Sequence, residues 1–163
     1  MERGGTELDL VYANRFDDED HRAKLEMWAE IVPAISRLTA IEEPVLDLAC
    51  DRGYFISNVA GRERWATDLR DVSSDLPADV KFVQGDGLEL ASSLPSGHFG
   101  TVFTSNYLEH LRSSDEVIEQ MRVVRRLLRP GGRFVVLQPN IRLVGGAYWD
   151  LDRKSTRLNS SHR

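Results

Sequence analysis

Apolar residues along this chain fall into short runs separated by helix-like segments, and this alternation predicts a sheet of parallel strands. Short, continuous apolar runs are typical of strands that are buried on both faces. The chain has five such segments, at residues 45–49, 64–67, 80–84, 99–104 and 133–138. Because strands that alternate with helices are joined by right-handed crossovers, we expect the five strands to run parallel.

The first helical pattern covers residues 21–38, where apolar residues from Leu25 to Leu38 keep the spacing of one helix face. Pro33 lies within this pattern and is expected to kink the helix or to restart it there. A second, shorter helix is predicted over residues 53–59. We expect the long helix to cover one face of the sheet.

The third helical pattern covers residues 115–128 and has the strongest signals of the three. Ser113 and Glu116 have the spacing of a capping box at its start. Pro130-Gly131-Gly132 is expected to end it. Its predicted apolar face consists of Val117, Ile118, Met121, Val124, Leu127 and Leu128.

Together these elements predict a doubly wound, Rossmann-like α/β domain over residues 21–151, with strand order 3-2-1-4-5. Residues 1–20 are polar and acidic and are expected to form an N-terminal arm. Residues 152–163, DRKSTRLNSSHR, are polar and without pattern, and residues 152–162 match the translation of a sequencing-adapter sequence. We therefore interpret residues 152–163 as an artefactual or disordered tail and leave them out of the predicted fold.

Composition narrows the class of protein. The chain has 163 residues, of which 29% are charged, and the single cysteine, Cys50, excludes an internal disulfide. We expect Cys50 to be a small buried apolar residue rather than a reactive thiol. No apolar run approaches the roughly 20 residues that span a bilayer, and the N-terminus lacks a signal peptide pattern. These features predict a cytoplasmic protein without a membrane span.

Charge argues against a nucleic-acid partner. The formal net charge is −5, and residues 152–163 hold four basic residues against one acidic residue, so residues 1–151 carry −8. Such a domain lacks the excess of basic residues that is typical of a nucleic-acid-binding protein.

Three acidic residues follow the first three strand regions at regular spacing. Asp47 lies in the first, Asp68 closes the second, and Asp86 follows the third within Gly85-Asp86-Gly87. Carboxyl ends of parallel strands share one sheet edge, next to the crevice where the strand order reverses. A carboxylate at the end of the second strand can accept both hydroxyls of a ribose. Because a full GxGxxG motif is missing, the pattern favours a nucleoside ligand without a pyrophosphate.

These motifs, in this order, resemble the class I S-adenosylmethionine-dependent methyltransferases, especially the bacterial type-11 domain. VLDLACDRGYF (residues 45–55) resembles the first motif of that family. SNYLEHL (105–111) resembles its motif after the fourth strand, and LLRPGGRFVVLQPN (127–140) its helix-to-strand signature. The family sheet has two further strands, so the resemblance implies that this chain lacks the last two and leaves the fifth as an open edge that invites association.

The resemblance implies that S-adenosylmethionine is the cofactor and that particular residues bind it. Asp47 and the turn through Ala49 to Gly53 would hold the methionine portion, Asp68 the ribose, and Asp86 with Gly87 the adenine. Asn106 would lie where methyl donor and acceptor meet. The family usually has glycine in place of Ala49 and Asp51, and an aspartate is strained where the turn requires positive φ.

The implied reaction is methyl transfer to a small-molecule, lipid or glycan nucleophile. A hydroxyl acceptor needs a base, and His110 is the nearest candidate in the sequence, although a structural role, hydrogen-bonded to loop backbone at the start of a helix, is the more ordinary one for it. No histidine has metal-ligand spacing, so no metal site is expected. The alternative hypothesis is an incomplete or non-catalytic domain that binds cofactor weakly or not at all. A nicotinamide-dependent oxidoreductase is a more distant one, opposed by the sparse glycines.

Overall fold

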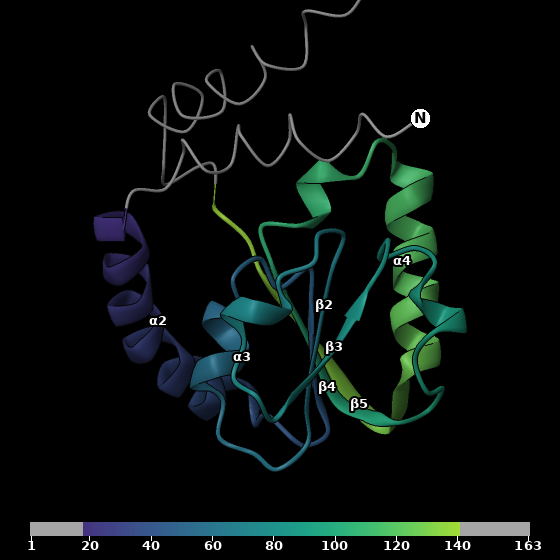
Figure 1. Ribbon diagram of the computed structural model, residues 1–163. Helices are drawn as coiled ribbons and strands as arrows, with labels where there is room; N and C mark the ends of the chain where they lie inside the picture. Colours follow the sequence, from purple (N-terminus) through teal and green to yellow (C-terminus); the bar gives the residue numbers. More distant parts are fainter. Residues whose placement is uncertain (1–17, 141–163) are drawn as a thin grey trace, which may run out of the picture.

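The computed structural model describes residues 18–140 and has three layers, with a parallel sheet between two layers of helices (Figure 1). Its elements follow in the order α2 (Asp18–Thr39), β1 (Val45–Leu48), α3 (Tyr54–Asn58), β2 (Arg64–Asp68), η1 (Ser73–Asp75), β3 (Val80–Gln84), η2 (Leu90–Ser92), β4 (Phe99–Ser105), η3 (Leu108–His110), α4 (Ser114–Leu127) and β5 (Leu128–Leu137). The predicted N-terminal arm lies almost wholly outside the described residues, and the predicted tail lies outside them entirely.

The sheet has the strand order β3-β2-β1-β4-β5, and every neighbouring pair of strands is parallel. This confirms the predicted order and the doubly wound class. Helices α2 and α3 cover one face, and α4 covers the other (Figure 1). The strand order reverses between β1 and β4, so the chain leaves these two strands in opposite directions and opens a crevice at their carboxyl ends.

The core explains why β1 is a continuous apolar run. Val45, Leu46 and Leu48 are at most 1% exposed, since helices pack on both faces of this central strand. Under α2 and α3, the rings of Phe55 and Phe103 stack with their centroids 3.6 Å apart, and a second apolar cluster lies under α4. The two clusters fix the position of β1 and of the turn that follows it.

Helix α2 runs through Pro33 as a single element, so the predicted restart at this residue is wrong. Pro33 lies on the exposed side of the helix, where water can bond the carbonyl that loses its N–H partner. The buried stripe of Trp28 and Val32 continues past it on the other side. Leu38, predicted on the apolar face, is 85% exposed.

Helix α4 forms as predicted, but its cap and its buried face differ in detail. Ser113 Oγ accepts the Glu116 N–H at 3.2 Å, as in a capping box, whereas the Glu116 carboxylate accepts the N–H of Arg112 instead of Ser113. Ile118 is 48% exposed, contrary to the prediction. The residues that are buried follow i, i+3, i+4, i+7 spacing and are Gln120, Val123, Val124 and Leu127.

Strand β5 begins at Leu128, earlier than predicted, and Pro130-Gly131-Gly132 lies inside it instead of ending α4. The regular pairing with β4 starts only at Arg133, and the pairing register shifts before that residue. At Gly132 a side chain would approach the Phe99 carbonyl oxygen to 2.8 Å, so this irregular entry requires glycine.

Two further features of residues 18–140 bear on function. None of their helices is long and apolar enough to cross a membrane.

Cys50 is 5% exposed, and burial raises the pKa of its thiol, which confirms the expectation of a buried, unreactive side chain.

Candidate functional site

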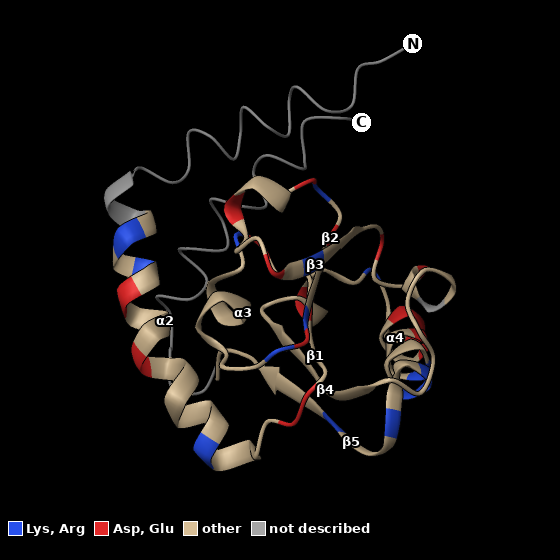
Figure 2. Cartoon of the chain, turned by 60° about the horizontal axis from the view of Figure 1, so that its bottom comes forward, with Lys and Arg blue, Asp and Glu red and all other residues tan. Residues whose placement is uncertain are grey.

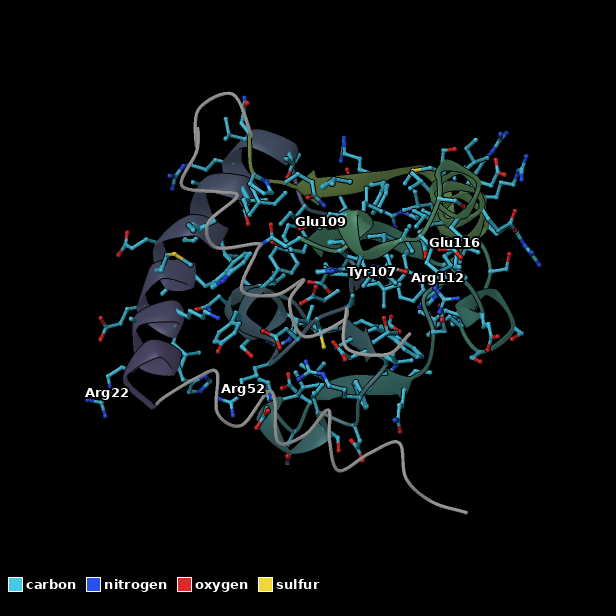
Figure 3. The ribbon with its side chains drawn as sticks, turned by 90° about the horizontal axis from the view of Figure 1, so that it is seen from above. Arg22, Arg52, Tyr107, Glu109, Arg112 and Glu116 are labelled. Carbon is cyan, nitrogen blue, oxygen red and sulfur yellow. The ribbon has the colours of Figure 1, made fainter. Side chains whose placement is uncertain are left out.

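The carboxyl ends of four neighbouring strands meet at one cavity of about 450 Å³. Its lining residues come from the end of β1 and the turn after it, the end of β2, the loop after β3 and the segment from β4 into the first turn of α4, and they are Leu48, Ala49, Thr67, Asp68, Leu69, Gly85, Asp86, Gly87, Leu88, Glu89, Tyr107, His110, Leu111, Arg112 and Glu116. Figure 3 looks down on this edge of the sheet and shows Tyr107, Arg112 and Glu116 together on the side of α4.

The structure brings together five of the eight residues predicted for the site. Ala49, Asp68, Asp86, Gly87 and His110 all line the cavity. The other three predicted residues, Asp47, Gly53 and Asn106, do not belong to its described lining. Asp47 is buried behind the turn, Gly53 starts α3, and Asn106 is an exposed residue with a φ of 50° whose N–H donates to Leu137 O at 3.1 Å.

The turn after β1 has the backbone shape of a glycine-rich loop although only one of its left-handed residues is glycine. Ala49, Asp51 and Gly53 have φ values of 58°, 52° and 72°. The predicted strain at Asp51 is present, and Ala49 shares it. Gly53 suits this position through its φ, and an added Cβ would also require the end of the Leu76 side chain to move.

Replacing Ala49 by glycine is expected to stabilise the fold by about 0.5–1 kcal/mol. Left-handed φ costs an L-residue roughly 1–2 kcal/mol, and glycine relieves this cost. The greater conformational freedom of glycine in the unfolded chain offsets part of the resulting stabilisation. Urea denaturation measures the difference. Ala29→Gly, on the exposed side of α2, is the control and is expected to destabilise instead, because glycine costs about 1 kcal/mol within a helix. Equal effects of the two substitutions would contradict the left-handed assignment.

Asp47 is a carboxyl group held in the core of the sheet. Its side chain is 2% exposed, the Ile56 N–H in the first turn of α3 donates to it, and its Oδ2 has no hydrogen-bond partner among the described residues. Burial raises the pKa of Asp47 to about 8, and the negative charges of Asp68 and Asp51 add to this. Near neutral pH this carboxyl is therefore mostly protonated.

Asp68 lies at the end of β2 and ties that strand to the turn after β1. Its Oδ2 accepts the Asp51 N–H at 2.9 Å, and its Oδ1 accepts the Arg70 N–H at 3.0 Å. The Arg70 side chain also donates from Nε to Asp68 Oδ1 at 3.3 Å and from Nη2 to Asp51 Oδ1 at 2.8 Å. Sequence analysis missed Arg70, because nothing in the spacing of residues 51 and 70 shows that their side chains meet.

The loop after β3 folds back on itself and packs against a polar pair formed by the half-buried Tyr107 and the buried Gln120. Asp86 Oδ1 accepts the Leu88 N–H at 2.9 Å and so shapes the loop. Beside it, the Tyr107 hydroxyl donates to Gln120 Oε1 at 2.8 Å, and Gln120 on α4 is fully buried. Burial, followed by the negative charges of Asp86 and Glu116, raises the pKa of Tyr107 to about 12. Sequence analysis missed this pair, although a glutamine within the apolar stripe of α4 was the available signal.

Replacing Gly87 by alanine is expected to destabilise the protein by about 1–3 kcal/mol, the usual cost of overpacking. The added Cβ would collide with the Tyr107 hydroxyl and come within 2.9 Å of Gln120 Oε1, so the buried pair must shift. Thermal unfolding measures the loss. Gly85→Ala is the matched control in the same loop, since its Cβ would meet only Leu90 Cδ2 at 3.3 Å. If Gly87→Ala lost no more stability than Gly85→Ala, the Tyr107–Gln120 pair would be able to move aside without cost, which would contradict the prediction.

His110 ends the short helix η3 at the rim of the cavity, and its backbone N–H donates to Tyr107 O at 2.9 Å. Its side chain is exposed, so it is accessible to a molecule that enters from solvent. Among residues 18–140, no group of three or more histidine, cysteine, aspartate or glutamate side chains is placed to hold a metal ion.

A second cavity, of about 570 Å³, lies between α4 and β5 and away from all the predicted site residues. Its lining is mostly apolar with the side chains of Arg125 and Arg129 at its border. Figure 2 shows basic residues where α4 leads into β5, and Arg129 and Arg133 of this region both pair with Glu42. We regard the smaller cavity as the functional site, because it collects carboxylates, loop backbone and the ends of several strands.

Comparison with known proteins places this chain among methyltransferases. A family model described as a methyltransferase domain matches residues 19–161. The Aspergillus luteorubrus protein ltbC, named as a probable methyltransferase, is 30% identical over 76 residues, which are 47% of this chain and 26% of that protein. The match thus spans about a quarter of this curated relative.

Solved structures share the fold. The glycopeptide N-methyltransferase MtfA in complex with S-adenosyl-L-methionine is 25% identical, with a TM-score of 0.53, and the alignment covers 67% of this chain and 53% of MtfA. MtfA has also been solved with sinefungin and with S-adenosyl-L-homocysteine. A candidate S-adenosyl-L-methionine-dependent methyltransferase of Methanococcus maripaludis is 15% identical, with a TM-score of 0.59, and covers 98% of this chain and 78% of its own; this likeness concerns the fold alone.

Proposed function

Since this chain belongs to the methyltransferase domain family, we propose that it binds S-adenosylmethionine in the cavity at the ends of β1 to β4 and transfers the methyl group to an acceptor. The observation that carries the proposal is that Asp68 and the loop Gly85-Asp86-Gly87, far apart in the sequence, line one cavity. When bound, S-adenosylmethionine supplies a methyl group on a sulfonium, which is already activated for transfer.

The residues present fit this cofactor. A cavity of about 450 Å³ lies within the range of small-molecule sites. It offers carboxylates to hydroxyl and amine groups, and its loop after β3 has a glycine that lets backbone approach a ring. Asp47 keeps a buried carboxyl oxygen directly behind the turn that has no hydrogen-bond partner within residues 18–140, and a nearby cation would favour its ionised form.

Each predicted residue has a role in this proposal. Asp68 accepts hydrogen bonds from the ribose, and Asp86 accepts one from the exocyclic amine of adenine while Gly87 gives room to the ring. Three further residues act at the methionine end: Asp47 supplies negative charge when the bound cation favours its ionised form, while Ala49 and Gly53 shape the turn. The protein contributes mainly by holding donor and acceptor in line, which can supply roughly 7–11 kcal/mol of the barrier.

The acceptor side lies next to the segment between β4 and α4. Asn106 and His110 lie at this end, and His110 is the candidate base if the acceptor is a hydroxyl. We propose a small-molecule, lipid or glycan nucleophile as acceptor. The likeness to MtfA, a glycopeptide N-methyltransferase, supports an acceptor of this kind and adds an amine as its reacting group.

Calorimetric titration of the full chain tests the proposal. S-Adenosylmethionine and S-adenosylhomocysteine are expected to bind, and NADH, which carries a pyrophosphate, is expected not to bind. Failure to bind S-adenosylmethionine at millimolar concentration would contradict the proposal and favour a non-catalytic domain. Binding without methyl transfer to any tested acceptor would retain the site and remove only the activity.

A further inference from the structure

The Arg70 side chain joins two acids across the ends of β1 and β2. Its guanidinium contacts Asp51 Oδ1 at 2.8 Å and Asp68 Oδ1 at 3.3 Å, and its side chain is 28% exposed. Asp51 comes from the turn after β1, where its φ is left-handed. Of the three residues, Asp68 lines the cavity, at the position proposed for the ribose.

Counting the acceptor positions of Asp68 shows how few are left for a ligand. An ionised carboxylate offers about four lone-pair positions, two on each oxygen. Oδ1 already accepts the Arg70 backbone N–H and the Arg70 Nε–H, and Oδ2 accepts the Asp51 N–H. About one position remains, whereas the two hydroxyls of a ribose require two.

Of the three donors, the Arg70 Nε–H is the one that can leave. The other two belong to backbone held by the turn and by the residues after β2, and their contacts are shorter, at 2.9 and 3.0 Å. The Nε contact is the longest, and the side chain that makes it is partly exposed. When the Nε–H leaves Asp68, Arg70 Nη2 can keep its contact with Asp51 Oδ1, which is 2.8 Å long. The positive charge of Arg70 therefore retains an acidic partner.

We propose that Arg70 is a clasp on Asp68 and thereby a specificity-determining residue: a ribose engages Asp68 with both hydroxyls only after the Arg70 side chain withdraws. The inference rests on the proposed cofactor site and deepens it. Moving the Arg70 side chain away from Asp68 costs free energy, and this cost weakens the binding of a ligand that has both ribose hydroxyls. A ligand with only one of the two hydroxyls uses the remaining acceptor position and leaves the clasp closed.

This difference between ligands separates a clasp from a merely structural arginine. If Arg70 only supported the turn after β1, its removal would change the affinity for every nucleoside ligand by the same factor. If it competes with the ribose for Asp68, its removal favours the complete ribose alone. The ratio of the two affinities is therefore the quantity to measure.

Arg52 provides the matched control. It belongs to the same turn region and carries the same charge, but its side chain contacts Asp75 at 3.6 Å and not Asp68. Figure 3 shows Arg52 apart from the group formed by Tyr107, Arg112 and Glu116. Its removal changes the charge near the site without changing the acceptor positions of Asp68, so any effect is expected to be the same for both ligands.

The test is calorimetric titration of the wild-type chain, Arg70→Met and Arg52→Met with S-adenosylhomocysteine and with its 2′-deoxy analogue. In Arg70→Met the affinity ratio of the two ligands is expected to rise about three- to tenfold, as for one contact with a partly exposed charged group. In Arg52→Met the ratio is expected to stay at its wild-type value.

An unchanged ratio in Arg70→Met, with wild-type binding intact, would overturn the clasp and leave the proposed function standing. If the wild-type chain binds neither ligand, the proposed function fails and the clasp fails with it. Arg70→Gln, which keeps a polar side chain, is the second variant should Arg70→Met not fold, and the same rise in the ratio is expected for it.

Discussion

Replacing Asp47 by asparagine is expected to remove a steep pH dependence from the stability of this protein. The pKa of Asp47 is raised from 3.8 to about 8 in the folded chain, mainly by burial. Between these two values the folded state holds a proton that the unfolded state releases, so stability falls as the pH rises through this window. Each pH unit is worth about 1.4 kcal/mol for one carboxyl. The total is therefore large on the scale of a domain's stability.

The asparagine variant keeps an oxygen to accept the Ile56 N–H and cannot ionise. It is expected to be more stable than wild type at pH 8, with the advantage shrinking toward pH 4. Urea denaturation at a series of pH values measures this. Glu26→Gln removes an exposed acid on α2 and is the control. Its stability is expected to decrease with rising pH as that of the wild type does. Parallel curves for wild type and Asp47→Asn would contradict the protonated state of Asp47.

Replacing Asp68 by alanine is expected to weaken binding of S-adenosylhomocysteine by more than the roughly 1–3 kcal/mol typical of one unsatisfied hydrogen-bond partner. The proposed site loses the acceptor for the ribose, and the turn after β1 loses the anchor for the Asp51 N–H. Calorimetric titration measures the loss, and thermal unfolding shows whether the variant is folded.

Asp71→Ala is the matched control for this prediction. Asp71 lies three residues further along, where its carboxylate accepts hydrogen bonds from the Ser73 N–H and hydroxyl outside the cavity. Its removal is expected to leave the affinity unchanged. Unchanged affinity in a folded Asp68→Ala variant would remove Asp68 from the site.

The sheet could be predicted from the sequence because strands buried on both faces have to be apolar throughout. Residues 80–84 match β3 in full, and the acids that follow the runs lie at one edge because parallel strands end together. The first and last residues of an element could not be predicted where backbone geometry, and not composition, decides them. The early start of β5 depends on a shift in its pairing with β4, which no local pattern shows.

The site itself was only partly predictable. Acids and glycines at strand ends have a recognisable chemistry, so Asp68, Asp86 and Gly87 could be named. Contacts such as that between Arg70 and Asp51 join side chains 19 residues apart and depend on the left-handed turn. Sequence spacing describes the backbone order but not which side chains share an acceptor.

Hydrogen exchange of the full chain with and without S-adenosylmethionine tests the central claim, that the cofactor binds at the cavity formed by the strand ends. We predict slower amide exchange in residues 49–53, 68–70 and 85–88, which line that cavity or directly adjoin its lining residues in the chain. Residues 121–134, which line the larger cavity between α4 and β5, are predicted to exchange at the same rate in both states. Protection confined to residues 121–134, or no protection at saturating cofactor, would contradict the account.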